Sequence, residues 1–404
     1  MTSTEPPGDP PPRASSGRFA PETPPRPFAV WINAVLAVLL LYVFLVGVEC
    51  LSGGIKGLGK GVMDEHLGQT LNPMLGLLAG VLATTLVQSS SVTTSLVVGL
   101  VASGQVSVAS AVPMIMGANI GTTVTNTIAS LAHATREAEF RRAFAAATCH
   151  DFFNFLSVAS LLPLELATRA LLGKGILELA SGWIASLTVG ASGAKYDSPL
   201  KAAFKAGRKA VAGAVDAVFD GKTASIALAA VGVVIIFVAL TGIVKVMKAL
   251  VLTRMERYVN RFLGRGGPVG IVVGVVLTVM VQSSSITTSI LVPLAGAGVM
   301  RVAQIYPITL GANLGTTITA LLASMVATEN AEAARQIAVV HLLFNLTGIL
   351  LFYVPRATRD LPVKAAQRLA EVAVRSRKWA VLYVLFGFYG LPAALFFAGR
   401  ALFG

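Results

Sequence analysis

Charged residues are scarce in this chain. Only 13% of its 404 residues are charged, whereas 55% are hydrophobic, and a soluble domain carries about 25% charged residues. This deficit excludes an ordinary soluble protein. Several apolar stretches approach or exceed the roughly 20 residues that a helix needs to cross a bilayer. We therefore expect an all-α polytopic membrane protein.

Cysteine is rare as well, and no catalytic constellation is present. Cys50 and Cys149 both lie in apolar sequence, which favours buried small side chains over a disulfide or a metal pair. The serine-rich motifs described below lack His and Asp partners at the spacing of a nucleophilic triad, and no cofactor-binding motif occurs. We expect neither an enzyme nor a bound cofactor.

Basic residues outnumber acidic ones, with a formal net charge of +13. The Lys and Arg residues lie almost wholly between the apolar segments. In that position they set orientation in the membrane and meet anionic lipid headgroups. The expected partner of this charge is the lipid bilayer and not nucleic acid.

One polar stretch occurs twice in the apolar sequence. Gln-Ser-Ser-Ser stands at 88–91 and again at 282–285, and residues 84–130 match 278–324 at a constant offset of 194 with 24 of 47 positions identical. The matching positions include Gly-Ala-Asn-x-Gly-Thr-Thr at 117–123 and 311–317, and His-x-x-x-Asn follows at 150–154 and 341–345. This agreement indicates an internal duplication.

Each Gln-Ser-Ser-Ser lies between short apolar arms, at 69–87 and 92–103 in the first copy and within 269–298 in the second. Arms of about 12 to 18 residues span roughly 18–27 Å, less than the ~30 Å hydrocarbon core. We predict two re-entrant helical hairpins, whose tips must be covered by protein or face a water-filled cavity.

A broken transmembrane helix is predicted after each hairpin, at 106–132 and at 305–325. The two glycines and the Asn of Gly-Ala-Asn-x-Gly-Thr-Thr lie in the middle of each of these spans.

The sequence divides into five parts. They are a disordered tail (1–27), a first transmembrane repeat (28–166), a linker with short interfacial helices at 176–189 and 201–218 (167–222), a second repeat (223–354), and a basic link with a final span at 379–398 (355–404). Interrupted helices in corresponding positions of two repeats are typical of secondary transporters.

The number of spans between the hairpins predicts inverted topology. Three firm spans, at 106–132, 143–166 and 224–246, place the two hairpins on opposite faces. The 14-residue piece at 176–189 would cancel this inversion if it crossed the membrane, and that question stays open. With the N-terminus inside, the basic links at 245–265 and 355–378 lie inside, whereas the basic stretch at 195–222 lies outside and counts against the assignment. The same parity places the C-terminus outside.

The polar residues can bind ions of both signs. A hairpin whose second arm begins at the serines presents a helix N-terminus, which attracts anions, and serine hydroxyls add donors. Neutral oxygens at helix breaks suit Na⁺, and Asp151 is a carboxylate well inside a span, which indicates function by default. Each of these residues also has a purely structural interpretation. A single Gln-Ser-Ser-Ser could serve helix packing, and Asn119 and Asn313 could be helix caps. His150 and His341 could be hydrogen-bonded packing residues, and Asp151 could have a solvated structural role.

These motifs resemble the type II sodium-phosphate cotransporter family. Paired Gln-Ser-Ser-Ser motifs are the hallmark of that family, and residues 113–127, 139–144 and 150–154 are similar to its animal members almost word for word. The resemblance covers about residues 28–400. It implies alternating-access cotransport of Na⁺ with inorganic phosphate, chiefly the divalent form.

The resemblance also implies site residues. Phosphate is expected at Gln88, Ser89, Ser90, Ser91, Gln282, Ser283, Ser284 and Ser285. Apart from the resemblance, oxygen-bearing side chains at the tips and helix breaks suit Na⁺, so sodium is expected among Gln88, Ser91, Asn119, Thr122, Thr123, Asp151, Asn154, Gln282, Ser285, Asn313, Thr316, Thr317 and Asn345, with no transition metal. The resemblance itself implies a sodium role for Asp151 and Asn154. In the family the aspartate matching Asp151 is associated with an extra Na⁺ and electrogenic transport, which we expect here.

The chain departs from the animal members in two places. It lacks their large cysteine-bearing loop between the repeats, which favours a bacterial protein of the inner membrane, and it stops one apolar span earlier, in keeping with an outside C-terminus. A carrier of another oxyanion or small carboxylate and a non-transporting phosphate sensor remain alternatives. The oligomeric state, monomer or homodimer, stays open.

Overall fold

The computed structural model describes residues 27–58, 72–190, 199–262, 267–327 and 330–403. These residues form helices and short connections, and no strand occurs among them. The longer helices are α1 (Pro27–Gly57), α3 (Pro73–Val87), α4 (Ser90–Ala102), α5 (Val108–Gly121), α6 (Val124–Ser130), α7 (Glu137–Leu172), α8 (Ile176–Gly190), α9 (Pro199–Asp216), α10 (Gly221–Phe262), α11 (Pro268–Val281), α12 (Ser284–Gly296), α13 (Val302–Met325), α14 (Ala331–Phe352), α16 (Leu361–Arg375), α17 (Arg377–Val384) and α18 (Leu391–Phe403). Three short turns, η1 (Leu131–His133), α15 (Arg356–Arg359) and the π-helical η2 (Leu385–Gly390), complete them. The predicted tail at 1–27 lies almost wholly outside the described residues.

Seven helical segments of the described chain are long and apolar enough to cross a membrane. They are Trp31–Gly57, Val108–His133, Glu137–Leu172, Gly221–Val246, Val302–Met325, Ala331–Phe352 and Arg377–Leu402. This confirms the predicted class, an all-α polytopic membrane protein. The predicted stretches at 176–189 and 201–218 are helical, as α8 and α9, and whether α8 crosses the bilayer stays a prediction.

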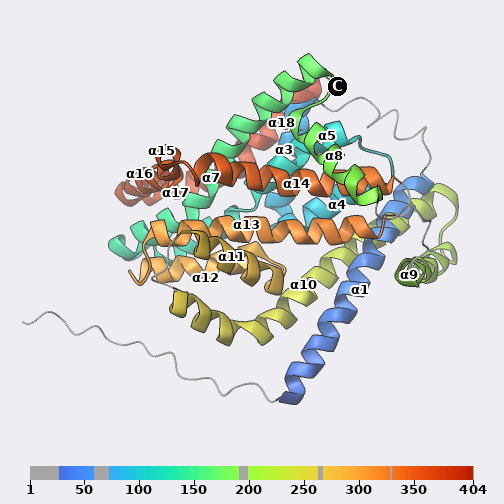
Figure 1. Ribbon diagram of the computed structural model, residues 1–404, viewed down its shortest axis with the longest axis horizontal. Helices are drawn as coiled ribbons and strands as arrows, with labels where there is room; N and C mark the ends of the chain where they lie inside the picture. The colour runs from blue at the N-terminus through green and yellow to red at the C-terminus, as the bar shows by residue number, and fades with distance from the viewer. Residues whose placement is uncertain (1–26, 59–71, 191–198, 263–266, 328–329, 404) are drawn as a thin grey trace, which may run out of the picture.

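Both predicted hairpins are present as pairs of short helices. α3 meets α4, and α11 meets α12, at the Gln-Ser junctions of the two repeated motifs. The first arms pack mainly on the helix that follows each hairpin: α3 lies along α5 and α11 along α13. Figure 1 shows the two hairpins in separate parts of the molecule, with α13 and α14 running side by side between them. The inverted relation of the repeats stays a prediction.

The two predicted broken helices differ. The first is interrupted at Thr122 and Thr123, between α5 and α6, as predicted. The second prediction is wrong, because α13 is one continuous helix of 24 residues. A glycine within a helix costs only about 1 kcal/mol, so Gly311 and Gly315 do not themselves force a break.

A difference in sequence after the motif accounts for this. Asn126 of α6 donates to Thr288 Oγ1 at 2.7 Å and accepts from Ser289 Oγ at 3.0 Å, so α6 is held against α12. The corresponding position in the second repeat is Ala320, which offers no such bonds. α13 continues without interruption through this position.

Glycines let the hairpin arms approach the core helices closely. A Cβ atom on Gly80 of α3 would overlap the carbonyl oxygen of Met114, and one on Gly274 of α11 would overlap that of Ile308. On the opposite helices, a Cβ atom on Gly117 of α5 or on Gly311 of α13 would likewise overlap a carbonyl oxygen of the hairpin arm. Small residues four apart are the usual means of bringing membrane helices into backbone contact. Both repeats use the same device at positions 194 residues apart.

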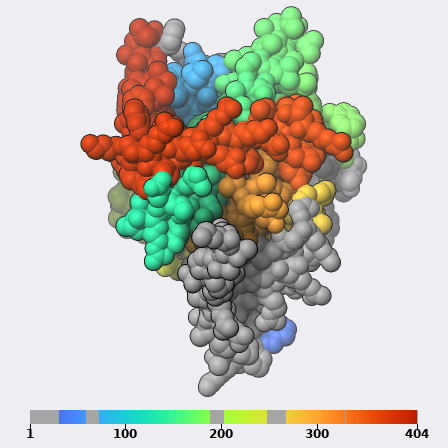
Figure 2. All heavy atoms as spheres, turned by 90° about the vertical axis from the view of Figure 1, so that its left-hand side faces the viewer, coloured from blue at the N-terminus to red at the C-terminus, as the bar shows by residue number. Residues whose placement is uncertain are grey.

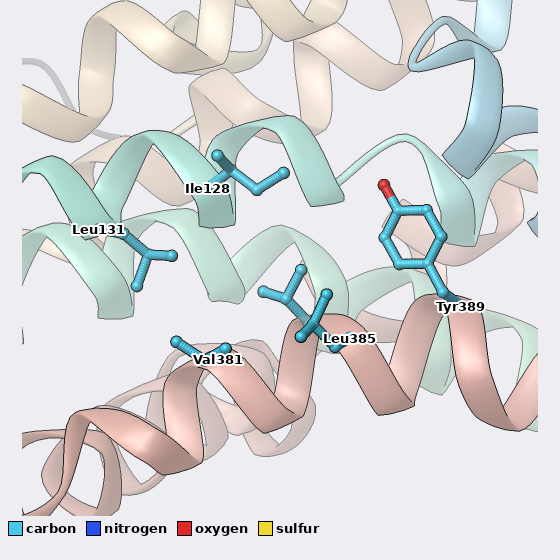
Figure 3. A pocket seen from close by; sticks show the side chains of 6 residues that line it. Ile128, Leu131, Val381, Leu385 and Tyr389 are labelled. Atoms are coloured by element: carbon cyan, nitrogen blue, oxygen red, sulfur yellow. The ribbon is translucent and has the colours of Figure 1, made fainter.

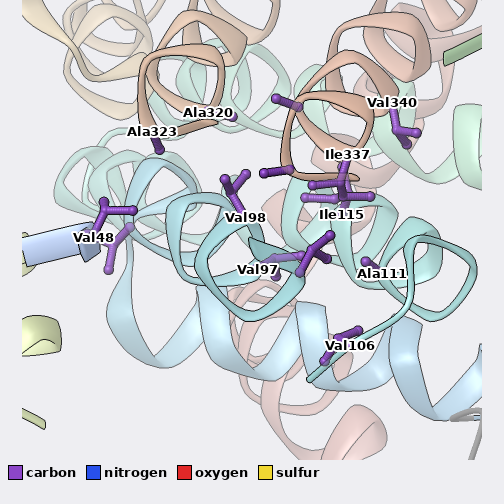
Figure 4. Close-up of a cluster of buried hydrophobic side chains, with 14 of the residues drawn as sticks. Val48, Val97, Val98, Val106, Ala111, Ile115, Ala320, Ala323, Ile337 and Val340 are labelled. Carbon is purple, nitrogen blue, oxygen red and sulfur yellow. The ribbon is translucent and has the colours of Figure 1, made fainter. Parts of the chain in front are cut away.

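Apolar side chains fill the space around these crossings. One buried cluster joins α1, α4, α5, α13 and α14, and includes Val98, Ile115 and Ile337 (Figure 4). A second cluster joins α7, the second hairpin, α13 and α16. The amphipathic α16 packs on α7, and the segment after α14 lies across this face of the molecule (Figure 2).

The glycine crossing leads to a stability prediction. Gly274→Ala should lower the thermal unfolding temperature of the detergent-solubilised protein, because the added methyl group overlaps a backbone carbonyl; overpacking costs about 1–3 kcal/mol. Gly213→Ala in the exposed α9 is the control, since nothing lies within 4 Å of its added Cβ. Equal melting temperatures for the two variants would contradict the crossing.

Candidate functional site

The two hairpin tips have the same backbone geometry. Gln88 and Gln282 adopt left-handed conformations, with φ of 54° and 56°, which is uncommon for residues other than glycine. Ser89 and Ser283 follow as N-caps, and their hydroxyls accept from the N–H groups of residues 92 and 286 at 3.4 and 3.3 Å. The second arm of each hairpin then begins at Ser90 or Ser284.

Each tip offers a helix N-terminus inside the protein. Ser90, Ser91 and Ser284 are buried, with 3–5% of their surfaces exposed. The first turn of a helix leaves its N–H groups without intrahelical partners, and here these groups belong to the serines. No Lys or Arg occurs within either motif. The tips therefore combine backbone donors and hydroxyls without a fixed cation.

The second tip is tied to its neighbour more firmly than the first. Gln282 Oε1 accepts from Thr319 Oγ1 of α13 at 2.9 Å, and Gln282 Nε2 donates to the carbonyl of Val279 at 2.7 Å. Gln88 at the first tip is exposed. Thr319 was not among the predicted site residues, because its distance of 37 residues from Gln282 carries no local signal.

Four asparagines from four helices meet in the core. Asn313 Nδ2 of α13 donates to Asn154 Oδ1 of α7 at 2.8 Å, and Asn345 Nδ2 of α14 donates to Asn119 Oδ1 of α5 at 3.2 Å. All four are at most 3% exposed. The two pairs correspond under the repeat, since 119 matches 313 and 154 matches 345. Each pair joins a helix of one repeat to a helix of the other.

Further bonds extend this asparagine cluster, but only on one side. Asn154 Nδ2 donates to the carbonyl of Asn119 at 2.7 Å, and His150 Nε2 lies 2.6 Å from Asn313 Oδ1. The counterpart of His150 is His341, whose ring nitrogens have no hydrogen-bond partner in the described structure. The cluster thus breaks the twofold relation of the sequences.

The structure brings together the predicted Asn residues, but their oxygens are engaged. Three of the four side-chain oxygens, those of Asn119, Asn154 and Asn313, already accept or share a hydrogen bond. The oxygen of Asn345 is buried and has no partner among the described residues. Thr122 and Thr316 hydroxyls donate to carbonyls one turn back in their own helices, at 2.9 and 3.0 Å. Thr123 and Thr317 do the same over three residues.

Asp151 lies apart from the asparagines, one turn away on α7. Its side chain is 1% exposed, and its Oδ2 accepts from Thr127 Oγ1 of α6 at 3.4 Å and from the Tyr383 hydroxyl of α17 at 2.7 Å. Its Oδ1 has no partner in the part of the chain that the structure describes. Sequence reasoning missed Tyr383, because one tyrosine in an apolar span is an ordinary feature.

Comparison with known proteins agrees with this duplicated architecture. The family described as Na+/Pi-cotransporter matches residues 43–189 and 235–374. The chain belongs to this family. The two matched segments contain both hairpins, the four asparagines and Asp151.

Curated relatives match most of the chain. Sodium-dependent phosphate transport protein 2A of Rattus norvegicus is 34% identical over 429 residues, which cover 90% of this chain and 67% of that protein. Protein 2B of Homo sapiens is 34% identical over 445 residues, covering 90% of this chain and 64% of that protein. The chain thus spans about two thirds of the length of these relatives. No solved structure matches it.

The asparagine cluster leads to a second stability prediction. Asn313→Ala removes the bonds to Asn154 and His150 and leaves both partners buried; each orphaned group costs about 1–3 kcal/mol. The thermal unfolding temperature should fall well below that of Ser324→Ala, a buried change on the same helix whose hydroxyl bonds only within α13. A fall no larger than that of the control would argue that the cluster contributes little.

Proposed function

We propose that this protein is a sodium-coupled symporter that imports inorganic phosphate by alternating access. The observation that carries the proposal is the pair of matching hairpin tips, with buried helix N-termini at Ser90 and Ser284. Membership of a cotransporter family makes the chain a transporter rather than an enzyme. Its relatives are named for sodium-dependent phosphate transport.

The tips suit phosphate because they supply donors and no fixed charge. Backbone N–H groups and the partial positive charge at a helix N-terminus bind phosphate oxygens, and serine hydroxyls add further donors. We assign phosphate to Gln88–Ser91 and Gln282–Ser285. Without a Lys or Arg counterion, the anion is held loosely enough to be released, and its charge is balanced by the Na⁺ ions that travel with it.

Sodium is assigned to oxygen-bearing residues of the two tips, of the α5–α6 break and of α5, α7, α13 and α14. Neutral oxygens near helix breaks coordinate Na⁺ in secondary transporters. The candidates are the predicted set: Gln88, Ser91, Asn119, Thr122, Thr123, Asp151, Asn154, Gln282, Ser285, Asn313, Thr316, Thr317 and Asn345. Na⁺ is here a coupling ion carried with the substrate, and no resident cofactor is proposed.

The buried carboxylate of Asp151 supports electrogenic transport. Three Na⁺ with one divalent phosphate carry one net positive charge, which yields about 2.3 kcal/mol at 100 mV. At 1.4 kcal/mol per tenfold, this energy raises phosphate accumulation roughly 50-fold. Two Na⁺ with the same anion carry no charge and gain nothing from the potential.

The proposed location is a bacterial inner membrane, with the N-terminus in the cytoplasm and the C-terminus in the periplasm. The basic residues of α15 to α17 then face the cytoplasm, as the positive-inside rule expects. The described spans make the protein a multi-pass membrane protein. A carrier of another oxyanion is the competing function, because helix N-termini do not by themselves choose among anions; competition with ³²P-phosphate uptake distinguishes the two.

The serine tips can be tested directly. Ser90→Ala and Ser284→Ala should each lower kcat/KM for Na⁺-driven ³²P-phosphate uptake into proteoliposomes at least tenfold, because a hydrogen bond to a charged group contributes about 1.5–3 kcal/mol. Ser186→Ala in α8 is the matched control, since its exposed hydroxyl donates only to the carbonyl of Trp183. Wild-type activity in both tip variants would remove the phosphate assignment.

The charge carried per cycle depends on Asp151. Asp151→Gly should retain Na⁺-dependent phosphate uptake but lose the inward current, because the cation bound by the carboxylate no longer travels with the anion. Current and ³²P uptake measured together on one proteoliposome preparation give the ratio of charge to phosphate. A voltage dependence equal to that of the wild type would contradict the role of this carboxylate.

A further inference from the structure

The last span lies outside both repeats, yet it reaches the site at two points. The Tyr383 hydroxyl donates to Asp151 Oδ2 at 2.7 Å, and the Tyr389 hydroxyl donates to the carbonyl of Thr85 at 3.3 Å. Thr85 is in the last turn of α3, directly before the first serine tip. One helix therefore touches both the buried carboxylate and the hairpin that leads to the proposed phosphate site.

The helix between these two contacts is irregular. Residues Leu385–Gly390 form a π-helical turn that begins two residues after Tyr383 and contains Tyr389. Such turns are rare in proteins and occur often at functional sites. The turn that carries Tyr389 thus departs from the regular α-helix that carries Tyr383.

Packing fixes the ring of Tyr383. Its centroid lies 6.3 Å from that of Phe144 on α7 and 5.5 Å from that of Phe388, both in edge-on arrangements. Both phenylalanines are fully buried. With its ring held in this way, the hydroxyl can reach Oδ2 of Asp151 and leaves Oδ1 on the other side of the carboxylate.

Beside these contacts the interface is open at the surface, where Ile128 and Leu385 are exposed. A cavity of about 250 Å³ lies between the last span and the α6–η1 segment (Figure 3). Apart from Tyr389, apolar side chains line it, with Ile128 and Leu131 facing Val381, Val384 and Leu385.

We propose that Tyr383 is a positioning residue that orients Asp151 for cation binding, and that the last span links this cation to the first serine tip through Tyr389. A carboxylate offers about four lone-pair positions. Tyr383 and Thr127 occupy Oδ2, which presents Oδ1 to the cation. The inference rests on the proposed sodium-coupled function, and it assigns part of the coupling to a helix that the duplication does not include.

The first experiment measures Na⁺ activation in Tyr383→Phe. The Na⁺ concentration for half-maximal ³²P-phosphate uptake should rise roughly tenfold, as expected for loss of a hydrogen bond to a charged group, while the phosphate KM at saturating Na⁺ changes less than twofold. Tyr306→Phe is the matched control, because that buried hydroxyl donates to the carbonyl of Phe352 at 3.0 Å, away from Asp151. Equal Na⁺ activation in the two variants would overturn the proposal.

A double-variant cycle separates positioning from a general structural effect. In the Asp151→Gly background, Tyr383→Phe should cause no further change in Na⁺ activation, because the carboxylate it orients is gone. Additive effects of the two substitutions would show that Tyr383 acts elsewhere and would also overturn the proposal. If the wild type itself shows no Na⁺-driven uptake, the proposed function fails, a result distinct from either outcome.

Tyr389→Phe tests the link to the tip. The phosphate KM measured at low Na⁺ should rise about threefold, whereas Tyr306→Phe should leave it unchanged; no rise would overturn the link. If Tyr383→Phe does not purify in a folded form, Na⁺-induced tyrosine difference absorbance of the detergent-solubilised wild type replaces the first measurement. A difference band in the wild type that is lost in Asp151→Gly supports the positioning role, and an identical band in both contradicts it.

Discussion

A backbone that leaves its helix within a bilayer must be covered by protein, because lipid offers its polar groups no hydrogen-bond partners. The two hairpin tips, at Gln88 and at Gln282, are such places if the hairpins are re-entrant as predicted. The short arms can be covered only if neighbouring helices come very close. The glycines at the α3–α5 and α11–α13 crossings allow this approach, because a Cβ at Gly80 or Gly274 would overlap a backbone carbonyl.

At the other end of each hairpin, the last backbone carbonyls are capped by a side chain from the opposite repeat. Arg142 of α7 donates to the carbonyl of Gly296 at the end of α12, with Nε at 2.9 Å, and Asn330 donates through Nδ2 to the carbonyl of Ala102 at the end of α4, at 3.4 Å. Residues 102 and 296 correspond in the duplication. Each repeat thus caps the hairpin of the other, so that neither hairpin can shift without loosening a contact in the opposite half. The asparagine cluster repeats this cross-connection in the core.

The sequence predicted those features that are encoded locally and twice. Repeated Gln-Ser-Ser-Ser between short apolar arms predicted both hairpins, and Gly-Ala-Asn-x-Gly-Thr-Thr predicted the break at Thr122. The same motif failed at Thr316: Asn126 bonds to α12 after the first break, whereas the methyl side chain of its counterpart Ala320 cannot form a hydrogen bond. Predicted candidates such as Asn154 and Asn313 do meet, but their partners across 159 residues could not be paired from spacing. Tyr383 gave no signal at all, since its role depends on where the last span packs.

In the proposed mechanism, the net charge moved in each transport cycle depends on residues that the two repeats do not share. The two tips and the two asparagine pairs occupy corresponding positions in the repeats and carry no charged side chain, so in the proposed mechanism they do not set the net charge of the cycle. Asp151 has Leu342 as its counterpart, and Tyr383 comes from a span that neither repeat contains. The carboxylate and its tyrosine therefore add a feature to one half only. Because a buried carboxylate binds a cation far more strongly than neutral oxygens do, this one-sided pair, rather than the duplicated core, sets the net charge of each transport cycle in the proposed mechanism.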